Sequence, residues 1–352
     1  MRHAATLSRL ALRGVLREAR RSVLTASAMA LGLALLIVSR AIADGAHEDW
    51  VETGVRLASG HLAIQAPGFQ ESGSLDDRLT GQQVRDARVA LESIEPRSEV
   101  MDVVSRLSVN GLASGPGSSV PTLILGVEPE AEGAFSRLSE NVVEGRYLES
   151  DDRLAAYVGV RLVERLGLRV GSRFVLTAQS SDGEIAGQLM RVTGIFRTGI
   201  DELDEALVHI PIATAREWLV APDAATTIAV LVSGSDRVEP VVEQLSERLA
   251  GAGVEVLPWT LTAPELDSAI RLDDYGDWTF HLILFAIVAL AILNAVLMSV
   301  LYRKREFGIL RALGLSAGET GALVFLEGLL LTACAGVAGM ILGFSVTWIF
   351  WR

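Results

Sequence analysis

Three long runs without a charged side chain dominate the hydrophobic pattern of this chain of 352 residues. The runs are 17, 24 and 24 residues long, and about 20 apolar residues suffice to cross the hydrocarbon core of a bilayer. We therefore predict membrane-spanning helices over residues 23–43, 278–301 and 322–351. A long polar segment separates the first span from the second, so the pattern predicts a membrane α-helical protein with one large domain outside the bilayer.

The charged residues predict the orientation of these spans. Residues 1–22 carry a net charge of +5 and residues 302–321 one of +2, whereas residues 44–277 carry −20. Short segments rich in arginine and lysine stay on the cytoplasmic side. We expect a basic N-terminal helix and the loop 302–321 in the cytoplasm. The acidic segment then forms a periplasmic domain of a multi-pass protein in a bacterial inner membrane.

The first apolar run has a second interpretation, a cleaved signal peptide. A basic stretch precedes it, and Ala41-Ile42-Ala43 has the small-x-small form of a cleavage site. Its apolar core of 17 residues is longer than signal peptides usually have, and Arg40 stands directly before the cut. We expect the segment to be retained as a span.

Residues 44–277 predict a mixed α/β domain. Thr80 to Ile94 has the apolar spacing of an amphipathic helix, and residues 227–257 show a strand–helix–strand order. Residues 151–210 contain several strand-like runs and predict a β-rich insert between two α/β parts, 44–150 and 211–277. Each α/β part alone is too small to bury a core, so we expect them to fold together.

The composition argues against several kinds of chemistry. The only lysine is Lys304 and the only cysteine is Cys334, so the chain contains neither a P-loop nor a disulfide or thiolate-zinc framework. The net charge of −12 argues against nucleic acid as a partner. The acidic runs 201–205 and 273–277 could bind a cation, although solvated loops explain them as well. We expect neither a catalytic residue nor a cofactor or metal in this chain.

The loop 302–321 predicts a short helix from Lys304 to Leu313 that ends at Gly314. Phe307, Leu310 and Leu313 form an apolar stripe at helical spacing, with Ile309 beside it. A helix this short needs a surface to lie against. Periodicity alone leaves two surfaces open, the lipid headgroups and a partner protein.

Small and polar residues within the spans predict helix packing. Ala28 and Gly32, and likewise Gly339 and Gly343, have the small-x-x-x-small spacing that lets helices approach closely. The residues that we expect at such contacts are Ala28, Gly32, Asn294, Glu327, Gly336, Gly339 and Gly343. Asn294 lies mid-span, where a hydrogen bond to a neighbouring helix is favoured.

Residues 305–314, Arg-Glu-Phe-Gly-Ile-Leu-Arg-Ala-Leu-Gly, followed by Glu327 at the start of a glycine-rich span, resemble the signature of FtsX-type ABC transporter permeases. Residues 59–68, 144–152 and 193–200 with Asp204 resemble the lipoprotein-releasing (Lol-type) permeases. Macrolide-exporter permeases are a more distant resemblance. The family has four spans, whereas three are predicted here.

The resemblance implies a permease subunit that a separate ABC ATPase drives, with ATP and magnesium on that partner. It assigns contact with the ATPase to Arg305, Glu306, Phe307, Gly308, Ile309, Leu310, Arg311, Ala312, Leu313 and Gly314. It also implies a second permease subunit, membrane lipids, lipoprotein or amphiphilic cargo and a periplasmic acceptor as partners. The outer domain would contain porter-like parts and the β-rich insert.

Two other functions fit the same pattern. The chain could transmit mechanical movement to export peptides or drugs, or it could signal, as FtsX-like proteins do, to a periplasmic partner. Removing an acyl chain from a bilayer costs about 0.8 kcal/mol per CH₂ group, on the order of 10 kcal/mol for one long chain. No residue of this chain supplies that energy, so lipid cargo requires an external ATPase.

Overall fold

The computed structural model describes residues 19–57, 59–94, 99–302, 304–312, 314 and 316–350. The chain divides into two compact units, which are described separately. One contains residues 51–269, and the other contains residues 1–50 and 270–352.

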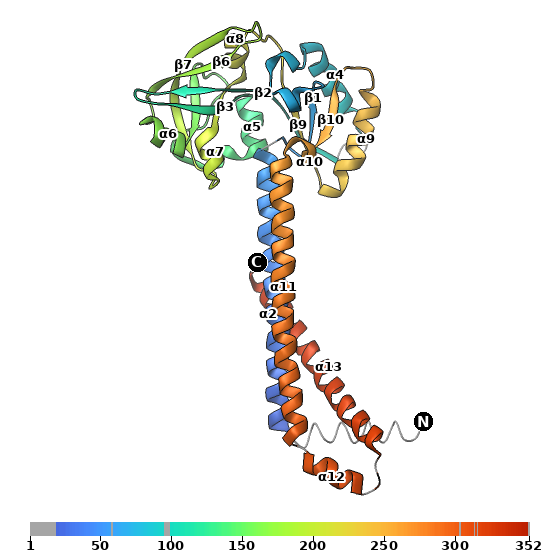
Figure 1. Ribbon diagram of the computed structural model, residues 1–352. Coiled ribbons are helices and arrows are strands. Elements are labelled where there is room, and N and C mark those ends of the chain that lie inside the picture. The colour runs from blue at the N-terminus through green and yellow to red at the C-terminus, as the bar shows by residue number, and fades with distance from the viewer. Residues whose placement is uncertain are drawn as a thin grey trace. The chain divides into compact units, whose positions relative to one another are not determined.

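The unit of residues 1–50 and 270–352 is helical in its described part (Figure 1). Its helices belong to α2 (Ala19–Leu57), α11 (Pro264–Tyr302), α12 (Lys304–Ala312) and α13 (Ala317–Phe350). Helices α2 and α11 are much longer than the apolar runs that predicted them. Both helices continue into polar sequence, because apolar residues are required where a helix crosses the membrane but not for the helix itself.

Two stretches of the described residues are long and apolar enough to cross a membrane, Ser22–Gly45 and Ala317–Ile349. They correspond to the first and third predicted spans. Helix α11 contains the second predicted span, 278–301, without confirming that it crosses a bilayer. Two candidate spans agree with a membrane protein, and the count of three stays a prediction.

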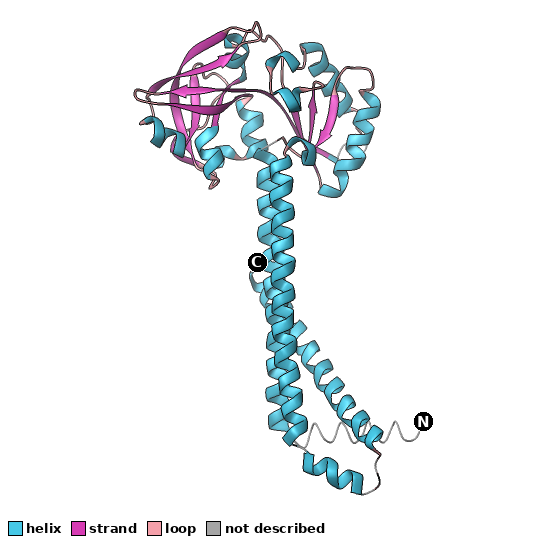
Figure 2. Cartoon of the chain, viewed as in Figure 1, coloured by secondary structure: helices cyan, strands magenta, loops and turns pink. Residues whose placement is uncertain are grey.

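The unit of residues 51–269 contains a sheet whose strands run in the order β10-β1-β9-β2-β3-β8-β5-β7-β4, with β6 paired to both β2 and β7. The strands are β1 (Leu62–Gln65), β2 (Val100–Ser114), β3 (Ser119–Val127), β4 (Val142–Gly145), β5 (Ala155–Gly159), β6 (Arg173–Gln179), β7 (Ile185–Phe196), β8 (Leu207–Pro211), β9 (Thr227–Val232) and β10 (Glu255–Pro258). Figure 2 shows the strands gathered in two groups that β2 connects.

The first group is β10, β1, β9 and the first half of β2. Helices α4 (Gly81–Glu92) and α9 (Val238–Arg248) bury their apolar sides on one face of it, where Leu62, Ile228 and Val230 form the core. Helix α5 (Pro129–Ser136) packs on the opposite face through Phe135. Alternate residues of β9 therefore serve two cores.

The second group surrounds the larger core of this unit. Helices α6 (Val160–Leu166) and α8 (Ile212–Trp218) contribute apolar side chains to it, and α7 (Asp201–Ala206) precedes β8. Two single-turn helices, α3 (Phe69–Ser72) and α10 (Trp259–Thr262), follow strands β1 and β10 of the first group.

The mixed α/β character predicted for this segment is confirmed. Thr80 caps α4 through a reciprocal capping box with Gln83, the local reason why the helix starts there. The predicted boundary at residue 150 separates strands that pair with each other, because β3 joins β8 and β4 joins β7. The β-rich part therefore also includes β3, β4 and the second half of β2.

Candidate functional site

Helix α12 (Lys304–Ala312) lies between α11 and α13, where the sequence predicts a short helix (Figure 1). Gly314 follows with φ of 106°, a left-handed conformation that glycine adopts without strain and that ends the helix. Ile309 is 61% exposed, and apart from the backbone of α12 and the residues next in sequence, no described atom lies within 4 Å of the Cβ position of Gly308. The helix thus presents an uncovered apolar residue beside a glycine.

The structure places the other predicted coupling residues on the same short helix. Arg305, Arg311 and Ala312 are exposed, and Glu306 is half-buried. Leu313 lies outside the described residues, and so do the side chains of Phe307 and Leu310. The predicted contact of these residues with an ATPase stays a prediction.

Three of the predicted packing glycines lie at helix–helix contacts. A Cβ on Gly32 of α2 would lie 3.0 Å from Val288 of α11, and one on Gly339 of α13 would lie 2.8 Å from the Ala30 carbonyl oxygen. At Gly343 the nearest atom is Ile37 Cβ, at 2.9 Å. These glycines allow close approach of α2 to α11 and to α13.

The remaining packing residues lie in different surroundings. Ala28 and Asn294 are exposed in this single chain, and among the described residues no atom outside the local backbone of α13 and the residues next in sequence lies within 4 Å of the Cβ position of Gly336. Glu327 is buried, with 8% of its surface exposed. The predicted helix contacts of Ala28, Asn294 and Gly336 stay predictions.

A charged cluster that the sequence did not predict links α2 to α11. Arg40 forms an ion pair with Asp44 at 2.6 Å and another with Asp277 of α11. His281 Nδ1 lies 3.1 Å from Asp277 Oδ1. Asp277, taken from sequence as part of a possible cation loop, is a helical residue that pairs with an arginine.

A buried ion pair lies in the unit of residues 51–269, at the last turn of α2. Arg106 of β2 donates to both carboxylate oxygens of Glu132 of α5, at 2.9 and 2.7 Å. The side chains are only 3% and 1% exposed. Arg106 also donates to the Arg56 carbonyl oxygen at 3.1 Å, and its guanidinium lies 5.0 Å from the Phe135 ring centroid.

Arg56 closes this network from the side of α2. Its guanidinium donates to the Phe135 carbonyl oxygen at 2.9 Å and to Glu52 at 2.7 Å. We refer to Arg56, Arg106, Glu132 and Phe135 as the helix-base cluster. Because buried charges are costly unless paired, this geometry fixes the end of α2 to β2 and α5.

The start of α11 lies against the same end of α2. A Cβ on Gly54 would lie 2.9 Å from Leu266, so the glycine permits close contact between the two helices. Just before α11, Thr262 is hydrogen-bonded to Ser59, and its carbonyl oxygen accepts from Gln70 at 3.0 Å. Both helix ends are therefore held to the first strand group.

Two buried histidines in this unit are held neutral. Burial lowers the pKa of His209 to about 4, with Glu132 opposing and Arg106 adding to the shift. Burial also lowers the pKa of His61, which accepts the Val232 N–H at Nδ1. Removal from water disfavours the charged imidazolium, so both rings serve as packing and hydrogen-bonding groups.

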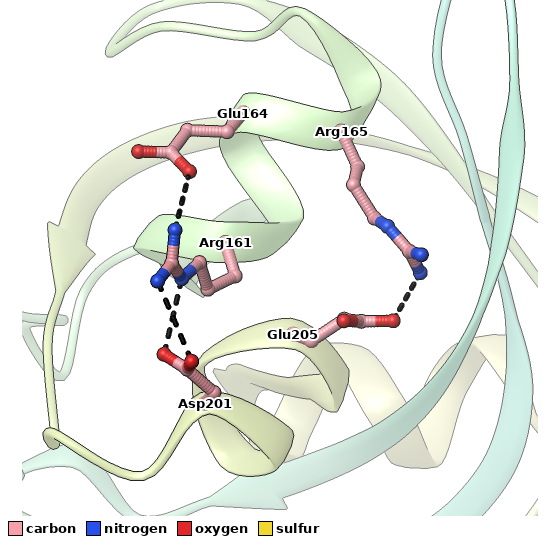
Figure 3. A pocket seen from close by; sticks show the side chains of 5 residues that line it. All are labelled: Arg161, Glu164, Arg165, Asp201 and Glu205. Carbon is pink, nitrogen blue, oxygen red and sulfur yellow. Dashed lines mark hydrogen bonds and ion pairs between the residues drawn. The ribbon is translucent and has the colours of Figure 1, made fainter.

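A charged pocket lies between α6 and α7, and the side chains that line it form ion pairs with one another (Figure 3). Arg161 pairs with Asp201 and Glu164, and Arg165 pairs with Glu205. Asp204 is buried and accepts from the Thr198 N–H at 2.7 Å. The acidic run 201–205 is thus a short helix with matched charges. Within the described ranges, no group of three histidine, cysteine or acidic residues could hold a metal ion.

The chain thus combines an α/β unit with helices that are long and apolar enough to cross a membrane. The model of the MacB-like periplasmic core domain matches residues 22–248, and that of the FtsX-like permease C-terminal matches residues 278–352. The chain belongs to this family and is an ABC transporter permease of the FtsX, LolC and MacB type. The resemblance seen in the sequence is confirmed.

Curated relatives that match most of the chain include a LolC protein and a MacB protein. The lipoprotein-releasing system transmembrane protein LolC of Neisseria meningitidis is 21% identical over 333 residues, 93% of this chain and 77% of its own length. The macrolide export ATP-binding/permease protein MacB of Hyphomonas neptunium is 24% identical over 363 residues, 97% of this chain and 53% of its own length.

Among solved structures, the periplasmic region of MacB from Actinobacillus actinomycetemcomitans matches with a TM-score of 0.41 and 13% identity. The match covers 62% of this chain and 95% of that region.

Proposed function

We propose that this chain is the membrane subunit of a system that releases or exports lipoproteins, or similar lipid-like cargo, from the inner membrane. The similarity to a LolC protein over 93% of this chain supports it, because the match includes the outer domain as well as the helices. The relative's name supplies the cargo class, and this chain's own architecture is compatible with it.

The proposed topology has three spans, with residues 1–22 and 302–321 in the cytoplasm and the domain of residues 44–277 in the periplasm. The net charges of +5, +2 and −20 support this orientation. A second permease subunit would complete the membrane part. ATP and magnesium would bind to a separate ATPase, and this chain would be non-catalytic.

Helix α12 is the proposed contact with that ATPase. Its exposed Ile309 and the glycine beside it suit docking into a groove of a partner. Movement of α2 and α11 would reach the outer domain through the helix-base cluster and the Gly54–Leu266 contact. Because these buried charged groups form several hydrogen bonds, the end of α2 would not shift against β2 and α5 without breaking them.

Reconstitution tests the cargo. The full chain and an ATP-binding subunit are placed in liposomes with a triacylated lipoprotein, and release into the soluble phase is measured with ATP. We expect ATP-dependent release of the acylated protein and none of the same protein without acyl chains. Extraction of a macrolide or a peptide in place of the lipoprotein would contradict the lipid-like cargo and favour the function that the MacB relative's name describes.

A further inference from the structure

Two charges that border the apolar runs of α2 and α11 form an ion pair. Arg40 is the first charged residue after the uncharged run of α2, and Asp277 is the last one before the uncharged run of α11. Tyr275 and Trp278, close to Asp277 in sequence, are 72% and 66% exposed, and such aromatic residues are enriched at bilayer surfaces. In the proposed topology, the ion pair therefore lies where both helices leave the hydrocarbon core.

Each member of the pair is oriented by a residue of its own helix. Arg40 Nε and Nη2 bind the two carboxylate oxygens of Asp44, at 3.1 and 2.6 Å, and Nη1 donates to Asp277. His281 Nδ1 donates to the Asp277 carbonyl oxygen at 2.9 Å and lies 3.1 Å from its carboxylate oxygen Oδ1. The guanidinium and the Asp277 carboxylate are thus held in position from both sides.

The surroundings determine how strongly these charges connect the helices. The Arg40 side chain is 55% exposed and that of Asp277 24%, and in water such a pair contributes little to stability. Beside hydrocarbon the effective dielectric constant is lower, so the attraction is stronger. A slip of α11 against α2 by one turn, about 5.4 Å, would separate the two charges next to the hydrocarbon core, where an unpaired charge is unfavourable.

A second contact between the same helices is apolar. The Cβ position of Gly32 on α2, about two turns from Arg40, lies 3.8 Å from Val288 Cβ on α11. Apolar contacts between helices in a bilayer gain little from hydrophobicity, because lipid chains are equally apolar. Packing at Gly32 therefore holds the axial position of the helices less firmly than a paired charge at the bilayer surface.

We propose that Arg40 is a positioning residue of the permease, which through Asp277 fixes the axial register of α2 against α11. The inference rests on the proposed coupling to an ATPase. With the register fixed, the two helices move as one body, and a displacement of α12, which follows α11 in the chain, reaches α2 as well. Without the ion pair, ATP hydrolysis continues, but less of the movement reaches residues 51–269.

A disulfide measures the register in the full chain. The Cβ–Cβ distance of 3.8 Å suits a disulfide, so Gly32→Cys with Val288→Cys should crosslink rapidly in a Cys334→Ser background. Moving the second cysteine by one turn, to Leu284 or to Ile292, should give little product.

Two variants show whether Arg40 sets this register. Arg40→Gln should lower the yield of the 32–288 disulfide at least threefold and raise the yield at position 284 or 292. Arg161→Gln is the matched control, because it removes an exposed ion pair of the outer domain and should change no yield.

Cargo release separates positioning from a merely structural role. In liposomes with an ATP-binding subunit, Arg40→Gln and Asp277→Asn should each reduce ATP-dependent release of an acylated protein at least fivefold, while ATP hydrolysis falls less than twofold. In the Arg40→Gln chain, oxidation of the 32–288 cysteine pair should restore at least half of the release, because the disulfide replaces the ion pair. Reduction should abolish this gain.

The proposal is overturned if the yield of the 32–288 disulfide is the same with and without Arg40. It is also overturned if the disulfide blocks release in a chain that keeps Arg40, since the helices would then have to slide during the cycle. No release by the unchanged chain would instead contradict the proposed cargo. The register measurement needs no cargo and would still decide the role of Arg40.

Discussion

Glu132→Leu is expected to destabilise the outer domain by about 3–5 kcal/mol, because it removes the carboxylate that compensates the buried Arg106 guanidinium. The loss is large since Arg106 is only 3% exposed and cannot turn to water without leaving the core. Urea unfolding of the full chain in lipid nanodiscs, followed by hydrogen exchange in residues 51–269, measures the change.

A double variant separates the unpaired charge from the loss of packing. Arg106→Met combined with Glu132→Leu replaces both partners by apolar groups of similar volume, and it should recover most of the stability lost in the single variant. Arg161→Ala breaks an exposed ion pair and should cost less than about 1 kcal/mol. If Glu132→Leu and the double variant destabilised the domain equally, the unpaired Arg106 charge would not be the cause of the loss of stability.

Ile309→Asp in α12 is expected to reduce stimulation of a co-expressed ATP-binding subunit at least tenfold. The substitution places a charge at an exposed apolar position of a nine-residue helix, where docking would bury it. Gly308→Pro should have a similar effect because proline removes a backbone donor inside the helix. ATP hydrolysis by the purified complex in nanodiscs gives the measurement.

The matched control for this prediction is Ile185→Asp, the same change at an exposed isoleucine of the outer domain. It should leave ATP hydrolysis unchanged. Membrane insertion of all three variants should equal that of the unchanged chain. Normal stimulation of ATP hydrolysis by both α12 variants would show that α12 is not needed for coupling to the ATP-binding subunit.

The sequence predicted the features that depend on local pattern. The apolar runs located α2, α11 and α13, and Thr80 with Gln83 located the start of α4. Glycine spacing also pointed to Gly32, Gly339 and Gly343, each of which lies within 3.0 Å of a neighbouring helix when a Cβ is added.

Features that depend on distant residues could not be predicted in this way. Arg106 and Glu132 belong to a strand and a helix that no spacing rule connects, and Arg56 joins them from α2. The sequence suggests a cation site or a solvated loop for residues 201–205, whereas they form helix α7. Its Asp201 and Glu205 pair with arginines of α6, which only the fold brings near.

Disulfide crosslinking at Ile309 tests most directly whether α12 contacts the ATP-binding subunit. The experiment uses Ile309→Cys in a Cys334→Ser background, so that the introduced thiol is the only one in the chain. With single cysteines along the surface of the ATP-binding subunit, we expect a rapid crosslink at one cluster of positions. No disulfide with any of these cysteines, together with an Ile309→Cys thiol that reacts only with a lipid-soluble reagent, would contradict the account.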